Sequence, residues 1–465
     1  MKCKCKHPDT GHFPLQGEGF SRRNFLRIAG TGIVASYFAD VLDPRLLSAA
    51  EVAPNVSLRN SARNCIFIFL SGAPSHVDLW DLKEGSWTPS DFAPTTYGST
   101  RWPQGLMPKT AAHLDKLSIA RSGLAWAAVH QLGQTWAQIA RNPGGATGAI
   151  APHIGAVVSL EFQLKRTVSD VLPGFIALNS GAIPTSGYLP AKYAPFGVTT
   201  ASTGLATLNH PDGATRFDRR WDLLHSLDLA RTSGALGKPS MDMNDFYDQS
   251  RALMKAPGIN AIFSFNDADH TRYGATTFGD SLIVARNLVG ANKGTRFVQT
   301  TLGGWDHHSD IYNKAAAQSI YTQSKQLDDA LGALFTDLST TAGANPGKTL
   351  LDETFIVILG EFGRTPGPLT NQGGRDHFLR NSYVFAGGGV KGGRIIGKTD
   401  AVGDKVVEYG WSANRDVRPE DVTSSMYSAL GIDYTTMRTD DPLGRGFEYV
   451  PDAKTGKYGP IEELF

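Results

Sequence analysis

Three short apolar runs of the chain each end in glycine or small residues, and charged residues follow. The runs span residues 64–70, 296–302 and 354–359 and are rich in aromatic and β-branched side chains. Each is too short for a typical helix, and a continuous apolar run of this length is typical of a strand buried on both faces of a parallel sheet. The pattern therefore predicts three central strands of an α/β fold with a largely parallel sheet.

Between the second and third runs, apolar residues recur at helical spacing over residues 311–338. Strand, helix and strand make a parallel crossover, which is expected to be right-handed and to place the ends of both strands at one edge of the sheet. Similar patterns predict further helices and strands, while residues 171–208, at the centre of a covering region around 165–215, read as irregular. The further helices are expected at 107–117, 126–140, 152–164, 218–254, 278–289 and 416–430, and the further strands at 118–123, 382–386 and 394–397.

Carboxylates, imidazoles and guanidinium groups follow the three central runs. Open α/β sheets bind ligands beyond the carboxyl ends of their strands, and carboxylate with imidazole is a common metal-ligand pairing. A solvated loop with surface ion pairs, or helix capping by the acids, would explain the same residues without a site. The residues are Asp78 and Asp81 after the first run, Asp306, His307 and His308 after the second, and Glu361, Arg364, Arg375, Asp376 and His377 after the third.

The first fifty residues form a separate segment. Arg22 and Arg23 precede a moderately apolar run at 28–42, and small residues follow at 48–50. This is the pattern of an export signal, and the paired arginines indicate the twin-arginine route. An N-terminal helix that stays attached is the alternative. We expect residues 1–50 to be the leader, residues 51–465 to be a single domain, and the mature protein to be periplasmic or secreted.

Charge and cysteine content narrow the function classes. The net charge is +1, and seven Lys/Arg against four Asp/Glu in the first fifty residues leave the remainder slightly acidic. Nothing here predicts a basic nucleic-acid surface. Two of the three cysteines, Cys3 and Cys5, lie in the leader, which leaves Cys65 and no disulfide framework. After the leader, no apolar stretch is long enough to predict a stable membrane span.

The motifs resemble those of a known family. SRRNFLR, FLSGAPSHVDLWD, GGWDHHSD, ILGEFGRTP and GGRDH occur in this order. They are similar to a large bacterial family named only as a domain of unknown function, exported by the twin-arginine route and related to sulfatases. The resemblance implies an alkaline phosphatase-like α/β/α sandwich with metals at the carboxyl ends of the central strands. The family's own substrates are largely undetermined, so the resemblance implies a scaffold more firmly than a reaction.

Carried over to this chain, the resemblance implies six metal ligands and two cations for a sulfate or phosphate group. Glu361 stands where the superfamily usually places an Asp-His pair after a strand. Asp376 and His377 match the superfamily's later loop, which contains a histidine. The nucleophile motif of sulfatases is absent from residues 126–136. His130 occupies that place as a nucleophile, proton donor, further ligand or core histidine, with Thr135 as the hydroxyl alternative. The implied ligands are Asp78, Asp306, His308, Glu361, Asp376 and His377, and the implied cations are Arg364 and Arg375.

These observations predict an exported metal-dependent hydrolase of a small-molecule or glycan sulfate or phosphate ester. One or two divalent ions are expected, and ligation by oxygen and nitrogen is compatible with Zn, Mn, Ca or Mg. Besides its substrate, the only partner expected is the twin-arginine translocation machinery. Two alternatives stay open, because a fold does not define a function. One is a non-catalytic metal- or carbohydrate-binding protein on the same scaffold, and the other is an exported component of an outer-surface complex.

Overall fold

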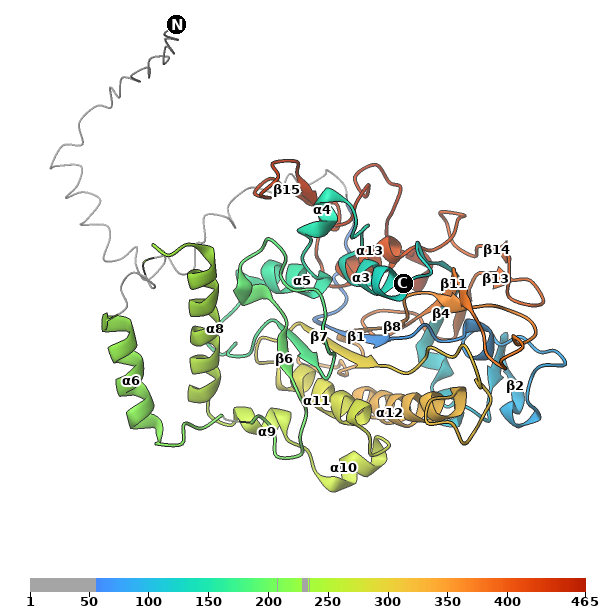
Figure 1. Ribbon diagram of the computed structural model, residues 1–465, viewed down its shortest axis with the longest axis horizontal. Coiled ribbons are helices and arrows are strands. Elements are labelled where there is room, and N and C mark those ends of the chain that lie inside the picture. The colour runs from blue at the N-terminus through green and yellow to red at the C-terminus, as the bar shows by residue number, and fades with distance from the viewer. Residues whose placement is uncertain (1–55, 207, 228–232, 234) are drawn as a thin grey trace, which may run out of the picture. The chain divides into compact units, whose positions relative to one another are not determined.

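The centre of the structure is a sheet of eight strands in the order β12-β4-β11-β8-β1-β7-β5-β6 (Figure 1). The computed structural model describes residues 56–206, 208–227, 233 and 235–465, so the predicted leader lies outside the described residues. Only β11 runs antiparallel to its neighbours, which confirms the predicted largely parallel sheet. The strands are β1 (Asn64–Leu70), β4 (Leu117–Leu124), β5 (Phe175–Leu178), β6 (Phe196–Val198), β7 (Phe297–Leu302), β8 (Thr354–Leu359), β11 (Arg380–Ala386) and β12 (Arg394–Ile396).

Strand β1 shows why the apolar runs form the sheet. All seven of its residues are buried, between β7 on one side and β8 on the other. Successive side chains point to opposite faces of a strand, and here both faces meet an apolar core. Ile66 and Ile68 belong to one core cluster, while Phe67 and Phe69 belong to the other. A strand covered on both faces has few positions for a polar side chain, so its sequence reads as a largely apolar run.

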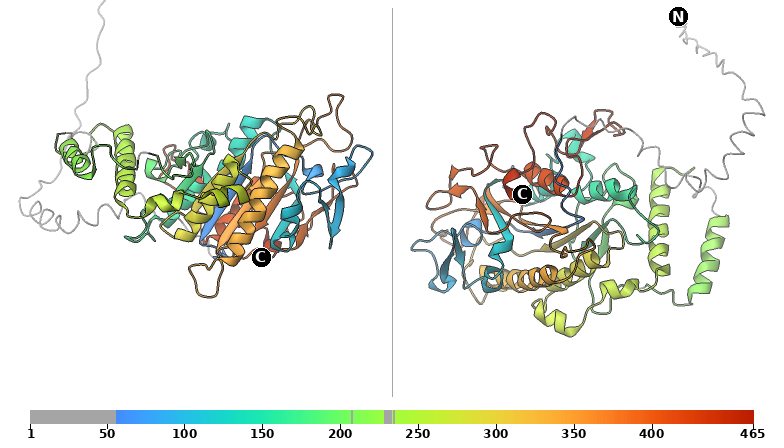
Figure 2. Two further views of the ribbon diagram at one scale, coloured as in Figure 1. Left: turned by 90° about the horizontal axis from the view of Figure 1, so that it is seen from below. Right: turned by 180° about the vertical axis from the view of Figure 1, so that it is seen from behind.

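Helices cover both faces of the sheet and complete an α/β/α sandwich (Figures 1 and 2). On one face, Leu282 of α11 and Leu331 of α12 pack in the core cluster of Ile66. On the other face, Val157 of α5 and Met426 of α13 pack in the cluster of Phe67. The main covering helices are α3 (His130–Ile139), α5 (Ile154–Gln163), α11 (Thr277–Ala291), α12 (Ile320–Thr340) and α13 (Pro419–Ala429).

The remaining elements are short or peripheral. None of the helices among the described residues combines the length and apolar character needed to cross a bilayer. The other helices are α2 (Pro108–Ala111), α4 (Ala146–Ala149), α6 (Ala214–Leu227), α8 (Lys238–Lys255), α9 (Ile259–Phe263) and α10 (Asp267–Arg272), with 3-10 turns at η1 (His76–Asp78), η2 (Ser90–Phe92), η3 (Leu114–Lys116), η4 (Ala191–Tyr193) and η5 (Glu462–Leu464). Two-stranded ribbons pair β2 (Pro94–Tyr97) with β3 (Thr100–Pro103), β9 (Gly363–Arg364) with β10 (His377–Phe378), β13 (Lys398–Thr399) with β14 (Val406–Glu408), and β15 (Met437–Arg438) with β16 (Phe447–Glu448).

Several predicted elements differ from the structure in extent. The helix expected from residue 311 begins at Ile320, because Ser319 caps it by accepting a hydrogen bond from the Thr322 amide. The region expected to be irregular contains β5 and β6, whose four and three residues are too few to show a strand period. The helix expected over 107–117 is only α2 followed by η3, and the helical stretch 218–254 is two helices, α6 and α8.

Candidate metal centre

Four ligand-type side chains meet at the edge of the sheet where the parallel strands end. His130 begins α3 after β4, Asp306 and His308 lie in the loop after β7, and His377 lies in β10, just before β11. One ligand atom from each side chain lies within 4.8 Å of the others. The predicted convergence of the loops after β7 and β8 at one edge is therefore present, and three of the four side chains come from the predicted ligand set.

The distances within this group match the spacing of ligands around one metal ion. The Asp306 Oδ1 atom lies 3.2 Å from His130 Nε2, 3.1 Å from His308 Nε2 and 3.7 Å from His377 Nε2. The Nε2 atoms of His308 and His377 are 2.9 Å apart. Tetrahedral ligands about 2.0–2.1 Å from a zinc ion are separated from one another by about 3.3 Å. These four distances scatter around that value, and the remaining pairs of ligand atoms lie within 4.8 Å.

Hydrogen bonds on the far side of each imidazole orient all three rings. The Nδ1 atom of His130 is 2.8 Å from Glu361 Oε1, that of His308 is 2.9 Å from Asp376 Oδ1, and that of His377 is 2.8 Å from the Ala128 carbonyl oxygen. Carboxylate and carbonyl oxygens accept hydrogen bonds, so each Nδ1 carries a proton, and in a neutral imidazole Nε2 then keeps its lone pair. Metal-binding histidines usually have such a partner.

The charges around the group suit a divalent cation. Burial works against ionisation of Asp306, but the hydrogen bond and charge of Arg364 outweigh it, and the pKa of this carboxyl is lowered. The hydrogen bond to Glu361 raises the pKa of His130, whereas burial lowers the pKa of His377. With neutral imidazoles, the carboxylates of Asp306, Glu361 and Asp376 exceed the single charge of Arg364 by two. A divalent ion would balance that excess.

Arg364 holds Asp306 rather than presenting a free charge. Its side chain is inaccessible to solvent, and its NH2 group donates to Asp306 Oδ1 at 2.5 Å. The other N–H groups donate to the carbonyls of Gly72, Ala73 and Arg375 and approach His308 Nε2 at 3.4 Å. Four of the five donors thus have oxygen acceptors within the protein, and the fifth approaches a nitrogen of the ligand group itself. Arg364 therefore holds Asp306, and its expected contact with a substrate oxyanion stays a prediction.

Glu361, an expected ligand, lies behind His130. Its Oε1 atom accepts hydrogen bonds from the Gly72 amide at 2.9 Å, from His130 and from Gln134 Nε2 at 3.2 Å. Its Oε2 atom is buried and has no hydrogen-bond partner among the described residues. Asp376 has the equivalent place behind His308. Both acids therefore orient imidazoles from outside the group of four.

Asp78 and Arg375 form a separate, fully buried ion pair. Arg375 Nε donates to Asp78 Oδ2 at 2.8 Å, and its NH2 group lies 3.2 Å from Asp78 Oδ1. The Tyr312 hydroxyl also donates to Asp78 Oδ1, at 2.8 Å. Asp78 is thus placed apart from the ligand group, in contrast to the expectation that it is a metal ligand. Arg375 donates its remaining N–H groups to carbonyls of its own loop and to Tyr312, and it is not free to bind an anion.

Backbone hydrogen bonds join the two loops that carry most of the group. The Arg375 amide donates to the His307 carbonyl at 2.9 Å, and the Asp310 amide donates to the Gln372 carbonyl at 3.2 Å. At Gly374 the loops touch so closely that an added Cβ would lie 2.0 Å from the carbonyl carbon and oxygen of His308. Glycine is required here, because any side chain would separate His308 from His377.

Helix α3 carries two further polar side chains near His130, Thr135 and Gln134. Thr135, the hydroxyl alternative, donates to the Gln131 carbonyl and is outside the ligand group. Gln134, which sequence reasoning missed, bridges Ser71 Oγ and Glu361 Oε1. Gln134 lies four residues after His130, so both side chains are on one face of α3. This spacing could have identified Gln134 as a neighbour of His130 from the sequence.

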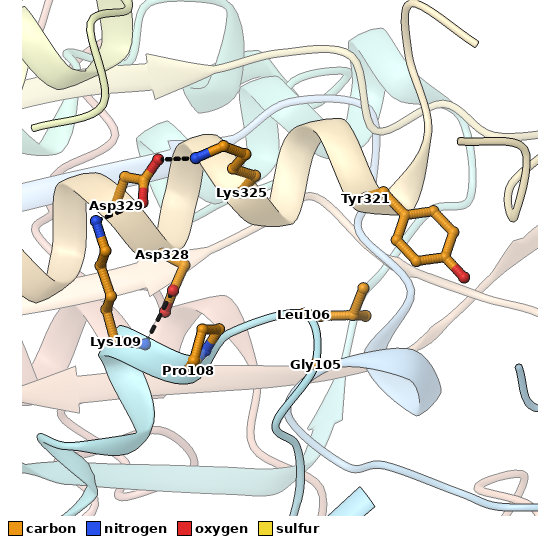
Figure 3. Close-up of a pocket in the computed structure, with 8 residues that line it drawn as sticks. All are labelled: Gly105, Leu106, Pro108, Lys109, Tyr321, Lys325, Asp328 and Asp329. Carbon is orange, nitrogen blue, oxygen red and sulfur yellow. Dashed lines mark hydrogen bonds and ion pairs between the residues drawn. The ribbon is translucent and has the colours of Figure 1, made fainter. Parts of the chain in front are cut away.

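A surface hollow on α12 is unrelated to the group of four. It encloses about 430 Å³ and is lined by residues of α12 and of the segment around α2 (Figure 3). Asp329 forms ion pairs with Lys109 and Lys325, and Asp328 accepts from the Lys109 amide at 2.9 Å. Its principal charges thus neutralise one another, and none of its lining residues belongs to the candidate metal centre.

An α/β/α fold with a histidine-rich candidate metal centre at the carboxyl edge of its sheet defines the class of this protein. The chain belongs to the family described as "Protein of unknown function (DUF1501)", whose model matches residues 62–455. This confirms the resemblance seen in the motifs. No curated protein matches the chain.

Among solved structures, the chain is similar at low sequence identity to the following three proteins. One is the lipoteichoic acid synthase LtaP from Listeria monocytogenes, with 9% identity and a TM-score of 0.38 over 90% of this chain and 81% of that one. Another is a protein in the alkaline phosphatase superfamily from Vibrio parahaemolyticus, with 9% identity and a TM-score of 0.35 over 87% and 76%. A third is the C-terminal periplasmic domain of EcEptC from Escherichia coli in complex with Zn, with 7% identity and a TM-score of 0.36 over 82% and 85%. We draw neither activity nor substrate from likenesses this remote.

Proposed function

We propose that this chain is a metal-dependent hydrolase of sulfate or phosphate esters, with one divalent cation held by His130, Asp306, His308 and His377. The observation that carries the proposal is the arrangement of the three imidazoles. Each donates its Nδ1 proton outward to an oxygen and turns its Nε2 atom toward Asp306 Oδ1. With all three imidazoles neutral, three lone pairs and a carboxylate would face one another at 2.9 to 3.7 Å, and either a cation or an added proton is needed between them.

The donor set narrows the choice of ion. Three nitrogen ligands and one oxygen suit zinc, whereas calcium and magnesium prefer ligand sets made of oxygen. We therefore propose zinc, with manganese as the next choice. The second ion that the sequence allows has no equivalent group of ligands among the residues that the structure describes.

The metal ion and the residues around it would have separate roles in ester hydrolysis. A bound divalent ion supplies Lewis acidity, which polarises the ester oxygen and lowers the pKa of an attacking water. Asp306 and His308 have side chains that are 46% and 42% exposed, so the ligand group is open to a substrate from solvent. Arg364 holds the Asp306 carboxylate in place, and Glu361 fixes the tautomer of His130. Such an open site accommodates an ester on a small molecule or on a glycan.

A non-catalytic metal-binding protein is the second candidate, and one observation favours it. Arg364 and Arg375, the cations that the family resemblance assigns to the oxyanion, both have side chains inaccessible to solvent and pair with Asp306 and Asp78. Charge stabilisation of the oxyanion is usually a large part of catalysis. Here it would depend on the metal alone.

Metal analysis and ester turnover distinguish these candidates. We expect residues 51–465 to contain about one zinc per chain and to hydrolyse p-nitrophenyl phosphate or sulfate. A chelator should abolish turnover, and added zinc should restore it. His308→Ala should remove both metal and turnover, while His225→Ala, outside the group, should keep both. Bound metal without turnover on either ester would favour the binding protein, and a metal-free wild type would reject both candidates.

Export by the twin-arginine route, to the periplasm or beyond, is proposed from the sequence alone. Arg22 and Arg23 lie outside the described residues, so the support is the paired-arginine pattern. Arg22→Lys/Arg23→Lys should retain the chain in the cytoplasmic fraction. Normal export of that variant would reject the route.

A further inference from the structure

Three arginines lie together at the amino edge of the sheet, opposite the edge that carries the candidate metal centre. Arg63 precedes β1, Arg296 precedes β7, and Arg166 lies in the segment between α5 and β5. Strand β7 pairs in parallel with β1 on one side and with β5 on the other, so all three strands begin at this edge. The charges of Arg63 and Arg166 both act on Arg296. The topology of the sheet therefore gathers three guanidinium groups that are far apart in sequence.

These guanidinium groups have no carboxylate partner. In the part of the chain that the structure describes, none of the acids forms an ion pair with any of the three. Arg63 and Arg296 instead donate to one neutral oxygen, Asn292 Oδ1, at 2.8 and 3.1 Å. Arg296 also donates to Asn64 Oδ1 at 3.3 Å, and Arg166 donates to backbone carbonyl oxygens. Three positive charges thus have only neutral hydrogen-bond acceptors in contact.

Only part of this positive charge is offset by the surroundings. Asp170 attracts Arg166 and Arg296, but its carboxylate forms its hydrogen bonds within its own turn. Asn292 follows the carboxyl end of α11, where the helix dipole is equivalent to about half a negative charge. Burial, and after it the charge of Arg63, lowers the pKa of Arg296. Asp170 and the dipole together leave an excess of positive charge at this edge.

Arg63 and Arg296 have N–H groups that remain available. Arg63 uses a single N–H in its bond to Asn292, and Arg296 uses only its NH1 group. Both residues are half-buried, and neither has a nitrogen atom that is buried without a partner, so their other N–H groups reach solvent. Planar guanidinium forks bind two oxygens of a phosphate or sulfate group at once. Two such forks beside each other are suited to one tetrahedral oxyanion.

A hollow of about 520 Å³ adjoins Arg63. Asp352 and Glu353 line it too, and their carboxylates accept hydrogen bonds from backbone amides of the segment 344–349 rather than from Arg63. Both acids would repel an anion inside the hollow. Arg296 does not line it, so the favourable position for an anion is between Arg63 and Arg296, outside the hollow.

We propose that Arg63 and Arg296 bind a phosphate or sulfate oxyanion, free or carried on a larger molecule, and that Arg166 adds a third positive charge. The anion would accept hydrogen bonds from both guanidinium groups and would supply the counter-charge that the described acids do not. Strand β1 has seven residues, which at about 3.3 Å per residue separate this site from the candidate metal centre by roughly 20 Å. The site is therefore distinct from the proposed hydrolase centre and goes beyond the proposed function.

Calorimetric titration of residues 51–465 with inorganic phosphate and with inorganic sulfate tests the proposal. The candidate metal centre could bind the same ions, so wild type and His308→Ala are titrated in parallel. We expect one binding event that both proteins share. Arg63→Gln/Arg296→Gln should weaken it by about tenfold or more, because it removes charge-assisted hydrogen bonds to the anion. Lack of this event in well-folded His308→Ala, or its survival at full strength in Arg63→Gln/Arg296→Gln, overturns the proposal.

A matched control removes the same charge elsewhere. Arg216→Gln/Arg220→Gln in α6 changes two arginines that already share a carboxylate, that of Asp212. This variant should bind phosphate as the wild type does. Equal weakening in both double variants would mean that the ions respond only to the net charge of the chain, and it would overturn the proposal.

Soaked crystals locate the ion without relying on a variant. Selenate has the shape and charge of sulfate, and its selenium atom gives an anomalous signal. We expect a peak within hydrogen-bonding distance of Arg63 and Arg296, and peaks only at other positions overturn the proposal.

Glucose 6-phosphate, titrated into His308→Ala, distinguishes the two sources of the oxyanion. Tighter binding of this ester than of inorganic phosphate identifies a group carried on a larger molecule, and the reverse order identifies the free ion. Binding of neither overturns the proposal. Because each measurement reads binding rather than turnover, its result does not depend on the proposed hydrolase activity.

Discussion

Glu361 accepts the Nδ1–H of His130 at 2.8 Å from a buried position, while Asp306 faces the other side of the same imidazole at 3.2 Å. The histidine is thus held between an acid that orients it and an acid that shares the proposed metal. A carboxylate behind a metal-binding histidine fixes its tautomer and raises its basicity. From the sequence, either acid could bind the metal or orient a histidine. The structure places Glu361 behind His130 and Asp306 within the group of four.

Glu361→Gln should weaken zinc binding by about 10- to 100-fold, the usual effect of losing a carboxylate behind a ligand. A neutral amide keeps the shape but is a weaker acceptor for His130. Competition with a chromophoric chelator measures the affinity. Asp376→Asn is the matched comparison behind His308. Because the Asp376 side chain is 63% exposed, its loss should have a smaller effect. Unchanged affinity in Glu361→Gln would mean that His130 does not bind the ion.

Gly374→Ala should reduce zinc binding more severely and should also destabilise the fold. The new Cβ would overlap the His308 carbonyl group, so the two loops must move apart. Gly303→Ala is the matched control in the neighbouring loop, because nothing lies within 4 Å of a Cβ there. Thermal unfolding with and without zinc measures both effects. If Gly374→Ala keeps the zinc-dependent rise in melting temperature of the wild type, the loops do not need this close contact.

The sequence predicted the positions of the central strands well, because burial on both faces leaves a run such as residues 354–359 almost entirely apolar. It also predicted that Asp306, His308 and His377 lie close together, because parallel strands end at one edge, and their role as metal ligands stays a prediction. The sequence could not show that Glu361 and Asp376 orient histidines and lie outside the group of four ligand-type side chains. A carboxylate behind an imidazole and one beside the ion have the same sequence pattern.

Asp78 shows a further limit of sequence reasoning. An acid that follows a central strand has the same sequence pattern whether it binds a metal ion or pairs with an arginine. The partner, Arg375, is almost three hundred residues away in sequence, and only the closed loops bring the two together. Strands β5 and β6 were missed for a different reason, since three or four residues between glycines and prolines carry no period.

Asp78→Ala should destabilise the protein by about 3–5 kcal/mol and leave its zinc content unchanged in the folded fraction. The variant leaves Arg375 buried without its ionic partner, and an unpaired buried charge is costly. Asp91→Ala is the comparison at an exposed pair with Lys314, where the loss should be below about 1 kcal/mol. Urea unfolding measures both. Loss of zinc from well-folded Asp78→Ala would instead return Asp78 to the ligand set.

Two buried histidines predict that stability falls as the solution becomes acidic. Burial lowers the pKa of His76 from 6.5 to about 4 and that of His153 from 6.5 to about 3. Below pH 6.5 the unfolded chain binds protons that the folded chain excludes, so the free energy of unfolding decreases as the pH falls toward these folded-state values. Each histidine should contribute a loss of about 1.4 kcal/mol per pH unit.

His153→Gln tests this directly, because glutamine does not titrate. The variant should lose about 1 kcal/mol at pH 7, since the His153 side chain accepts a hydrogen bond from the Gly155 amide at the start of α5. Between pH 6.5 and pH 5 it should lose about 2 kcal/mol less than the wild type. Phe175→Leu, which alters the ring 4.7 Å from His153, should lower stability equally at both pH values. Urea unfolding at the two pH values measures the difference, and parallel pH profiles for wild type and His153→Gln would show that this imidazole is protonated equally in the folded and unfolded chains.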